Sequence, residues 1–282
     1  MNIAVIGVSR EAVMAIITIS RELAALGDET AQELAKAMQY RFVNKHSLEN
    51  RMKSYGVAGR KLENYDERKP SFWASLSQDR DDYLHYLKTA MLTEAAGGNC
   101  IFIGRGANAV FRAVPGVVSI FLAAPLDIRL ERVKSYFHCD ERRARQIIDQ
   151  SDHDRAGFHR YFFDTDWKDP ANYQLCLNTG AVSPPECALM VKQLADRFQS
   201  GEETPRIQEL LLAQKVARHI LYEKGIGIHF LEVAVSGTGV ELFGIARSQA
   251  LLEAAAAAAA EVPAVSSVKP AMQVAHDYSL IP

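Results

Sequence analysis

Short apolar runs, separated by stretches with helical spacing, constrain the fold of this chain more than any other feature. Runs at 15–19, 100–103, 117–122 and 173–177 contain few polar residues and show no clean alternation of apolar and polar positions. Strands that are buried on both faces of a sheet have this pattern. Apolar residues recur at three- and four-residue spacing between and after these runs, over 29–39, 72–96, 126–137, 140–150 and 186–199. Alternating strands and helices predict an α/β fold of three layers, with helices on both faces of a parallel sheet.

A change of composition near residue 200 predicts a domain boundary. The segment Gln199-Ser-Gly-Glu-Glu-Thr-Pro205 combines Ser, Gly, Pro and charge without periodicity, as linkers do. Beyond it, two alternating runs flank a Gly-Thr-Gly turn at 237–239, which indicates a β-hairpin. We therefore predict an N-terminal extension (1–13), a large domain (14–199), a linker (200–206) and a small α+β domain (207–275). The small domain has the predicted order αββαβ, with elements at 207–223, 230–235, 240–246, 248–261 and 265–274.

The start of the large domain contains two similar segments. Val8-Ser-Arg-Glu11 and Ile19-Ser-Arg-Glu22 each follow an apolar run, so either run is a candidate for the first strand. Only the second is followed by a long helical pattern, and we favour it for that reason.

Charge and composition exclude several broad classes. With 32 basic and 34 acidic residues, the net charge of −2 gives no reason to expect a general nucleic-acid binder. The four cysteines lack the pairing of a zinc site or a disulfide scaffold, and we expect reduced thiols. The histidines near the middle of the chain lack metal-ligand spacing, so no metal site is expected. No signal peptide or transmembrane segment is predicted, which favours a cytoplasmic protein.

The first strand leads into a turn with the order of a phosphate-binding loop, followed by a helix. Such loops use glycines so that backbone N–H groups converge on a phosphate at the helix N-terminus. Here Ala24, Ala25 and Leu26 occupy the turn, and Gly27 is its only glycine. Asp28 and Glu29 favour the helix dipole but neutralise the end that a phosphate would use. An ordinary β-turn-α connection therefore remains the competing interpretation.

Arginines follow two of the other predicted strands. Gly104 and Arg105 lie just beyond the run at 100–103, where open parallel sheets bind ligands. Arg129 and Arg132 are three residues apart on one helix face. A forked guanidinium suits charge-assisted recognition of phosphate, although a solvated helix with surface ion pairs is the alternative for the second pair.

Four segments resemble the cytidylate kinase-like family. They are Ile17-Thr-Ile-Ser-Arg-Glu22, the Gly104-Arg105 pair, Ala124-Pro-Leu-Asp-Ile-Arg-Leu-Glu-Arg132, and Asp152-His-Asp-Arg155 with the aromatic stretch after it. The resemblance implies a P-loop kinase-type fold for the large domain. It also implies nucleotide contacts by Ser20, Arg21, Gly27, Thr30, Gly104 and Arg105, and catalytic positions at Arg129, Arg132, Asp152 and Arg155.

Residues 207–275 resemble a BON domain, with Val235-Ser-Gly-Thr-Gly-Val-Glu-Leu-Phe-Gly244 as its hairpin. This resemblance implies a module without catalysis that binds a lipid or a protein partner.

Two functional hypotheses follow, and the sequence leaves open whether the protein is an enzyme. In the first, it is a nucleoside monophosphate kinase that transfers phosphate from ATP, with Mg²⁺, to a nucleotide such as CMP. In the second, it is a kinase-derived nucleotide-binding or regulatory protein whose degenerate loop no longer binds ATP efficiently. The acceptor-side arginines support the first hypothesis, and the turn at 24–26 supports the second.

Overall fold

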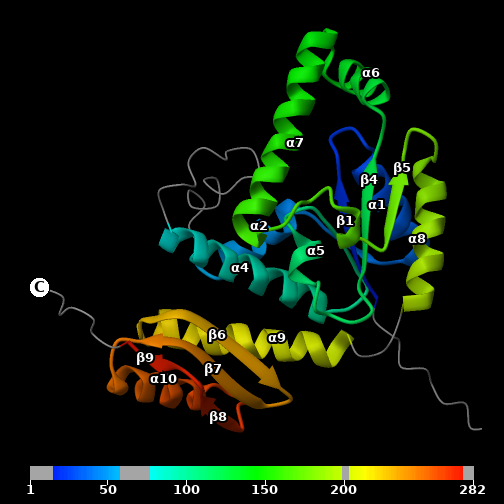
Figure 1. Cartoon of the computed structure of the whole chain (residues 1–282). Coiled ribbons are helices and arrows are strands. Elements are labelled where there is room, and N and C mark those ends of the chain that lie inside the picture. Colours follow the sequence, from blue (N-terminus) through cyan, green and yellow to red (C-terminus); the bar gives the residue numbers. More distant parts are fainter. Residues whose placement is uncertain (1–14, 58–76, 199–202, 276–282) are drawn as a thin grey trace, which may run out of the picture. The chain divides into compact units, whose positions relative to one another are not determined.

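The computed structural model describes residues 15–57, 77–198 and 203–275, which form two compact units (Figure 1). The first unit comprises the chain up to Arg80 and the segment Gly97–Thr204. The second comprises Asp81–Ala96 and the chain from Pro205 onward. The predicted extension at 1–13, and with it the first of the two similar segments, lies outside the described residues.

A five-stranded parallel sheet forms the centre of the first unit. Its order is β2-β3-β1-β4-β5. The bounds are Ile16–Arg21 (β1), Arg41–Val43 (β2), Cys100–Ile103 (β3), Val118–Ala123 (β4) and Leu175–Asn178 (β5). The predicted parallel sheet is confirmed, and the favoured second segment is indeed a strand. The short strand β2 was not predicted.

Helices connect the strands of this sheet. They are α1 (Gly27–Met38), α2 (Lys45–Ser54), the start of α4 (Ser77–Ala96), α5 (Ala107–Val110), α6 (Leu126–Phe137), α7 (Glu141–Phe163) and α8 (Pro184–Phe198). On one face, Leu34 of α1 and Val191 of α8 pack against Ile17, Ile101 and Ile120. The opposite face carries ring contacts such as Phe102 with Phe111 and Phe121 with Trp167. The three predicted layers are therefore present.

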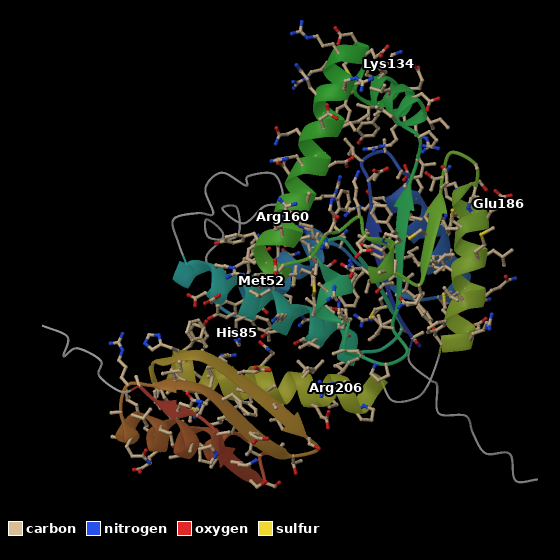
Figure 2. The ribbon with its side chains drawn as sticks, in the orientation of Figure 1. Met52, His85, Lys134, Arg160, Glu186 and Arg206 are labelled. Carbon is tan, nitrogen blue, oxygen red and sulfur yellow. The ribbon has the colours of Figure 1, made fainter. Side chains whose placement is uncertain are left out.

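The first turn of α8 illustrates how the chain defines its helix ends. Glu186 accepts hydrogen bonds from the backbone N–H of Ser183 at 2.8 Å and from its hydroxyl at 2.5 Å. Figure 2 shows Glu186 at this end of the helix. These hydrogen bonds lower the pKa of Glu186, and an acidic group in the first turn is stabilised by the helix dipole.

The second unit combines a helix pair with a small mixed sheet. It contains the 81–96 part of α4, then α9 (Glu203–Arg218) with a π-helical turn (His219–Glu223), β6 (Ile228–Ser236), β7 (Gly239–Ala246), α10 (Gln249–Glu261), β8 (Ser267–Pro270) and β9 (Gln273–Val274). β6 and β7 form the predicted antiparallel hairpin, and β8 and β9 both run parallel to β7. The single strand predicted at 265–274 is thus two short strands.

Within the described residues, every helix is too short or too polar to cross a lipid bilayer.

Candidate functional site

A cavity of about 460 Å³ opens at the carboxyl ends of β1, β2 and β3. Ligands of open parallel sheets bind at this edge. Ten residues line the cavity, which we call the arginine pocket: Arg21, Asp28, Asn44, Lys45, His46, Glu49, Ile103, Arg105, Ser151 and Arg155. Four of these are Arg or Lys and two are Asp or Glu, so the lining favours an anionic ligand.

Arg105 reaches the pocket from an unusual backbone turn. Gly104, Arg105 and Gly106 have φ angles of 71°, 56° and 70°, all in the left-handed region. Every residue except glycine has a higher conformational energy in that region, so the contacts of Arg105 with its neighbours hold it there. A Cβ atom on Gly106 would lie 2.1 Å from the Phe163 ring, which shows how closely α7 packs against this turn.

The Arg105 side chain is 3% exposed and already has partners. Its Nη2 donates to Glu49 Oε1 at 3.2 Å, and its guanidinium carbon lies 5.8 Å from the centre of the Phe158 ring. Lys45 Nζ lies 3.7 Å from the same Glu49 oxygen. Glu49 therefore balances two of the pocket's cations.

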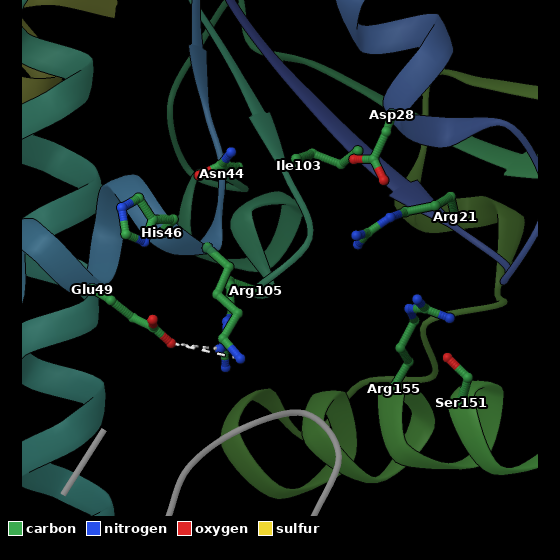
Figure 3. A pocket seen from close by; sticks show the side chains of 10 residues that line it. Arg21, Asp28, Asn44, His46, Glu49, Ile103, Arg105, Ser151 and Arg155 are labelled. Atoms are coloured by element: carbon green, nitrogen blue, oxygen red, sulfur yellow. Dashed lines mark hydrogen bonds and ion pairs between the residues drawn. The ribbon is translucent and has the colours of Figure 1, made fainter. Parts of the chain in front are cut away.

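The other arginines of the pocket come from separate elements. Arg21 is the last residue of β1, and Arg155 is one helical turn beyond Ser151 on α7. Figure 3 shows Arg21 and Arg155 on one side of the cavity, near Asp28, and Arg105 on the other side beside Glu49. Three residues singled out from the sequence, Arg21, Arg105 and Arg155, thus line one cavity.

Helix α2, which was not predicted, contributes one wall of the arginine pocket. Asn44 caps this helix by accepting the Ser47 N–H at 3.0 Å, and Lys45, His46 and Glu49 follow in its first turns. An Asn just before a helical segment is a recognised start signal. That signal, applied to Asn44, would have found the helix.

Two residues with side chains have left-handed backbone angles in the turn after β1. Ala24 has φ 60° and Leu26 has φ 53°, both left-handed. A residue with a Cβ in this region costs about 1–2 kcal/mol. Ala24 and Leu26 therefore hold backbone conformations that glycine would adopt without this cost.

Polar groups of the protein itself occupy this turn. The Leu23 N–H donates to Asp152 Oδ1 at 3.0 Å, and the Leu23 carbonyl accepts Arg129 Nε at 2.8 Å. Arg132 Nη1 donates to the Ala24 carbonyl at 2.9 Å, and its Nη2 donates to the Thr179 carbonyl at 2.7 Å. Arg129 and Arg132 are therefore directed at the loop backbone rather than into the arginine pocket.

Arg129 lies between two carboxylates. Its Nη1 is 3.1 Å from Glu22 Oε2, and its Nη2 is 2.5 Å from Asp152 Oδ2. Lys168 Nζ contacts the other Glu22 oxygen at 2.6 Å. The Arg129 side chain is 6% exposed, and those of Glu22 and Asp152 are 11% and 13% exposed, so the Glu22–Arg129–Asp152 network is largely withdrawn from water.

Other residues singled out from the sequence have structural partners. The Thr30 hydroxyl is buried and donates to the Leu26 carbonyl at 2.8 Å. Ser20 is buried on β1 and hydrogen-bonds Tyr173, whose pKa burial raises to about 12. Gly27 begins α1, where an added Cβ would lie 2.5 Å from Arg21 Cγ.

Glu22, Asp152 and Thr30 do not fit a Mg²⁺ site. Magnesium prefers oxygen ligands, but Glu22 and Asp152 already pair with Arg129 and Lys168, and the Thr30 hydroxyl donates to backbone. Across the described segments, no group of three or more His, Cys, Asp or Glu side chains gathers as metal ligands do.

Several solved structures are similar to this chain at low sequence identity. A structure of an uncharacterized protein from Eubacterium ventriosum shares 20% identity, covers 64% of this chain and 98% of its own, and has a TM-score of 0.52. A shikimate kinase from Bacteroides thetaiotaomicron (15% identity, 65% of this chain, 99% of that chain) has a TM-score of 0.40. A sugar kinase from Janibacter sp. (14% identity, 69% and 98%) has the same TM-score. No curated protein matches the chain.

Family profiles cover both units. The profile of the BON domain matches residues 209–276, which agrees with the resemblance noted for the small domain. The profile of the cytidylate kinase-like family matches residues 16–181, more than half of the chain. The match includes every loop and pocket residue described above, and the chain therefore belongs to the cytidylate kinase-like family.

Proposed function

We propose that the first unit binds a nucleoside monophosphate such as CMP, with the phosphate in the arginine pocket. The observation that carries the proposal is the meeting of Arg21, Arg105 and Arg155, from three separate elements, in one cavity. A phosphate monoester is mostly a dianion at neutral pH, and guanidinium groups bind it through charge-assisted, often bidentate hydrogen bonds. The cavity volume of about 460 Å³ lies within the usual range of small-molecule sites.

We further propose that this chain is a kinase-derived binding or regulatory protein that uses ATP poorly. The turn after β1, where the phosphates of ATP would bind, supports this proposal. Asp152 accepts the Leu23 N–H, and Arg129 and Arg132 donate to carbonyls of this turn. A phosphate that entered this turn would meet these groups and the side chains of Ala24 and Leu26. The predicted use of Mg²⁺ with ATP belongs to the competing hypothesis below.

The competing function is phosphoryl transfer from ATP to CMP, and membership of the cytidylate kinase-like family favours it. Phosphoryl transfer needs mainly positive groups placed around the transferred phosphate. Arg21 and Arg155, on the same side of the pocket, are the groups available for this role (Figure 3).

Calorimetric titrations with CMP and with Mg·ATP, followed by an ADP-release assay, separate the two. Our proposal expects CMP binding, no measurable ATP binding and no ADP release. ATP binding with CMP-dependent turnover would show an active kinase, and absence of CMP binding would remove the pocket assignment. Cytidine, which lacks the phosphate, serves as the control for recognition of the anionic group.

For the second unit, the lipid or protein partner implied by the BON resemblance stays a prediction, as does a cytoplasmic location.

A further inference from the structure

Asp152 connects the turn after β1 to helix α7. One carboxylate oxygen accepts the Leu23 N–H at 3.0 Å, and the other contacts Arg129 Nη2. Phosphate-binding loops present backbone N–H groups to an anion at this position in the fold. In this chain, the anion that receives a loop N–H is a carboxylate of the protein itself.

The Glu22–Arg129–Asp152 network stabilises the hydrogen bond between Asp152 and the Leu23 N–H. Arg129 donates to the Leu23 carbonyl and pairs with both carboxylates, while Lys168 pairs with the remaining Glu22 oxygen. Two carboxylates thus face two cations. Separating a buried ion pair of this kind is unfavourable, because each side chain would become a buried charge without a partner.

Asp152 also lies next to the part of α7 that faces the arginine pocket. Ser151 precedes it and Arg155 follows one turn later, and both line the cavity (Figure 3). Arg155 Nη1 is 3.4 Å from Asp152 Oδ1, the oxygen that accepts the Leu23 N–H. The contact that ties α7 to the loop therefore fixes the side of the pocket that carries Arg155.

We propose that Asp152 is a positioning residue that takes the place of a bound phosphate at the loop and holds α7 against the sheet. By doing so it keeps Ser151 and Arg155 in the wall of the arginine pocket when no donor nucleotide is bound. The ligand of the pocket is the one in our proposed function, but the contact between Asp152 and the loop stands independently of that ligand.

The test compares three variants of the full chain: Asp152→Ala, Asp152→Asn and the control Asp149→Ala. Asp149 is an exposed carboxylate one turn earlier on the same helix, outside the arginine pocket and outside the network. Hydrogen–deuterium exchange is followed at residues 22–30 and 149–156, and CMP affinity is measured by calorimetry. If Asp152→Ala does not fold, Asp152→Asn tests the proposal, because it removes the negative charge but keeps an oxygen that can accept a hydrogen bond.

The proposal expects faster exchange in both segments for the Asp152 variants, and CMP binding weakened about tenfold or more. Asp149→Ala should change neither. Adding formate to Asp152→Ala should restore part of the exchange protection and of the CMP affinity, because a small carboxylate fits where the side chain was removed. A general loss of packing would not respond to formate.

Unchanged exchange at residues 22–30 in both Asp152 variants would overturn the proposal. So would faster exchange with unchanged CMP affinity, because Asp152 would then not position the pocket. If the wild-type chain does not bind CMP, the proposed function fails. The exchange and formate measurements still decide whether Asp152 holds the loop.

Discussion

In the proposed CMP complex, Glu49 competes with the phosphate for Arg105, and Glu49→Gln should therefore strengthen phosphate binding. In the structure, Arg105 Nη2 donates to Glu49 Oε1 at 3.2 Å, and Lys45 lies 3.7 Å from the same oxygen. A phosphate that binds these cations must displace the carboxylate or accept its repulsion. Glutamine has nearly the same shape and still offers Arg105 a hydrogen-bond acceptor, so the substitution removes mainly the charge.

The size of the effect follows from the burial of the two partners. A hydrogen bond to a charged group contributes about 1.5–3 kcal/mol. The Arg105 side chain is 3% exposed but that of Glu49 is 23% exposed, so water screens part of the interaction. We expect a gain of about 1 kcal/mol, or about fivefold tighter CMP binding. The gain should shrink as salt is raised, because the repulsion it removes is screened.

Calorimetry with CMP provides the measurement, with cytidine as the ligand that lacks a phosphate. The matched control is Glu33→Gln, which removes one negative charge from α1 where Glu33 pairs with Lys36 at 2.8 Å, outside the pocket. Without ligand, Glu49→Gln should melt at a lower temperature, because Arg105 loses its charged partner, and CMP should raise the melting temperature more than in wild type. Weaker CMP binding by Glu49→Gln would refute the competition and make Glu49 a residue that orients Arg105.

Three further predictions concern the pocket, the loop and the second unit. Arg105→Ala should weaken CMP binding by about 1.5–3 kcal/mol in calorimetry, and an unchanged affinity would remove Arg105 from the site. Ala24→Gly with Leu26→Gly should raise the free energy of unfolding, measured by urea denaturation, by about 0.5–1 kcal/mol per site, since glycine relieves the left-handed strain but adds freedom to the unfolded chain. ATP binding should stay absent in this variant because Asp152 still holds the Leu23 N–H, and its appearance would identify the side chains as the defect. Burial, followed by the charges of Arg218 and Lys88, lowers the pKa of His85 to about 4. Its neutral form therefore stabilises the fold above pH 6.5 and this contribution is lost as pH falls toward 4. Between pH 7 and pH 5 the unfolding free energy of wild type should fall up to about 2 kcal/mol more than that of His85→Phe.

The central sheet could be predicted because its strands are buried on both faces. Runs such as Cys100–Ile103 leave few positions for polar residues, and the amino-acid sequence alone shows this pattern. Strand β2 has only three residues, of which Val43 alone is buried, so it lacks that pattern. Helix α7 extends to Phe163, well beyond the predicted end at residue 150, since no proline interrupts it and Gly157 is tolerated within it.

The candidate site could be predicted only in part, because its residues belong to two different places. Arg105 and Arg155 line the pocket, and their contact with a nucleotide stays a prediction. Arg129 and Asp152, grouped with them from the family resemblance, instead contact each other and Leu23. More than a hundred residues separate Leu23 from either partner along the chain, and no local pattern reports such a contact.

Gly27 shows why counting glycines does not measure the capacity of this loop for phosphate. It is the only glycine of the turn, and the family resemblance implies that it contacts a nucleotide. The left-handed positions are instead Ala24 and Leu26, whereas Gly27 already belongs to α1. A Cβ at position 27 would lie 2.5 Å from Arg21 Cγ, so the glycine makes room for a side chain that lines the arginine pocket. The positions where backbone conformation favours glycine carry side chains, and the one glycine of the turn instead gives Arg21 room at the arginine pocket.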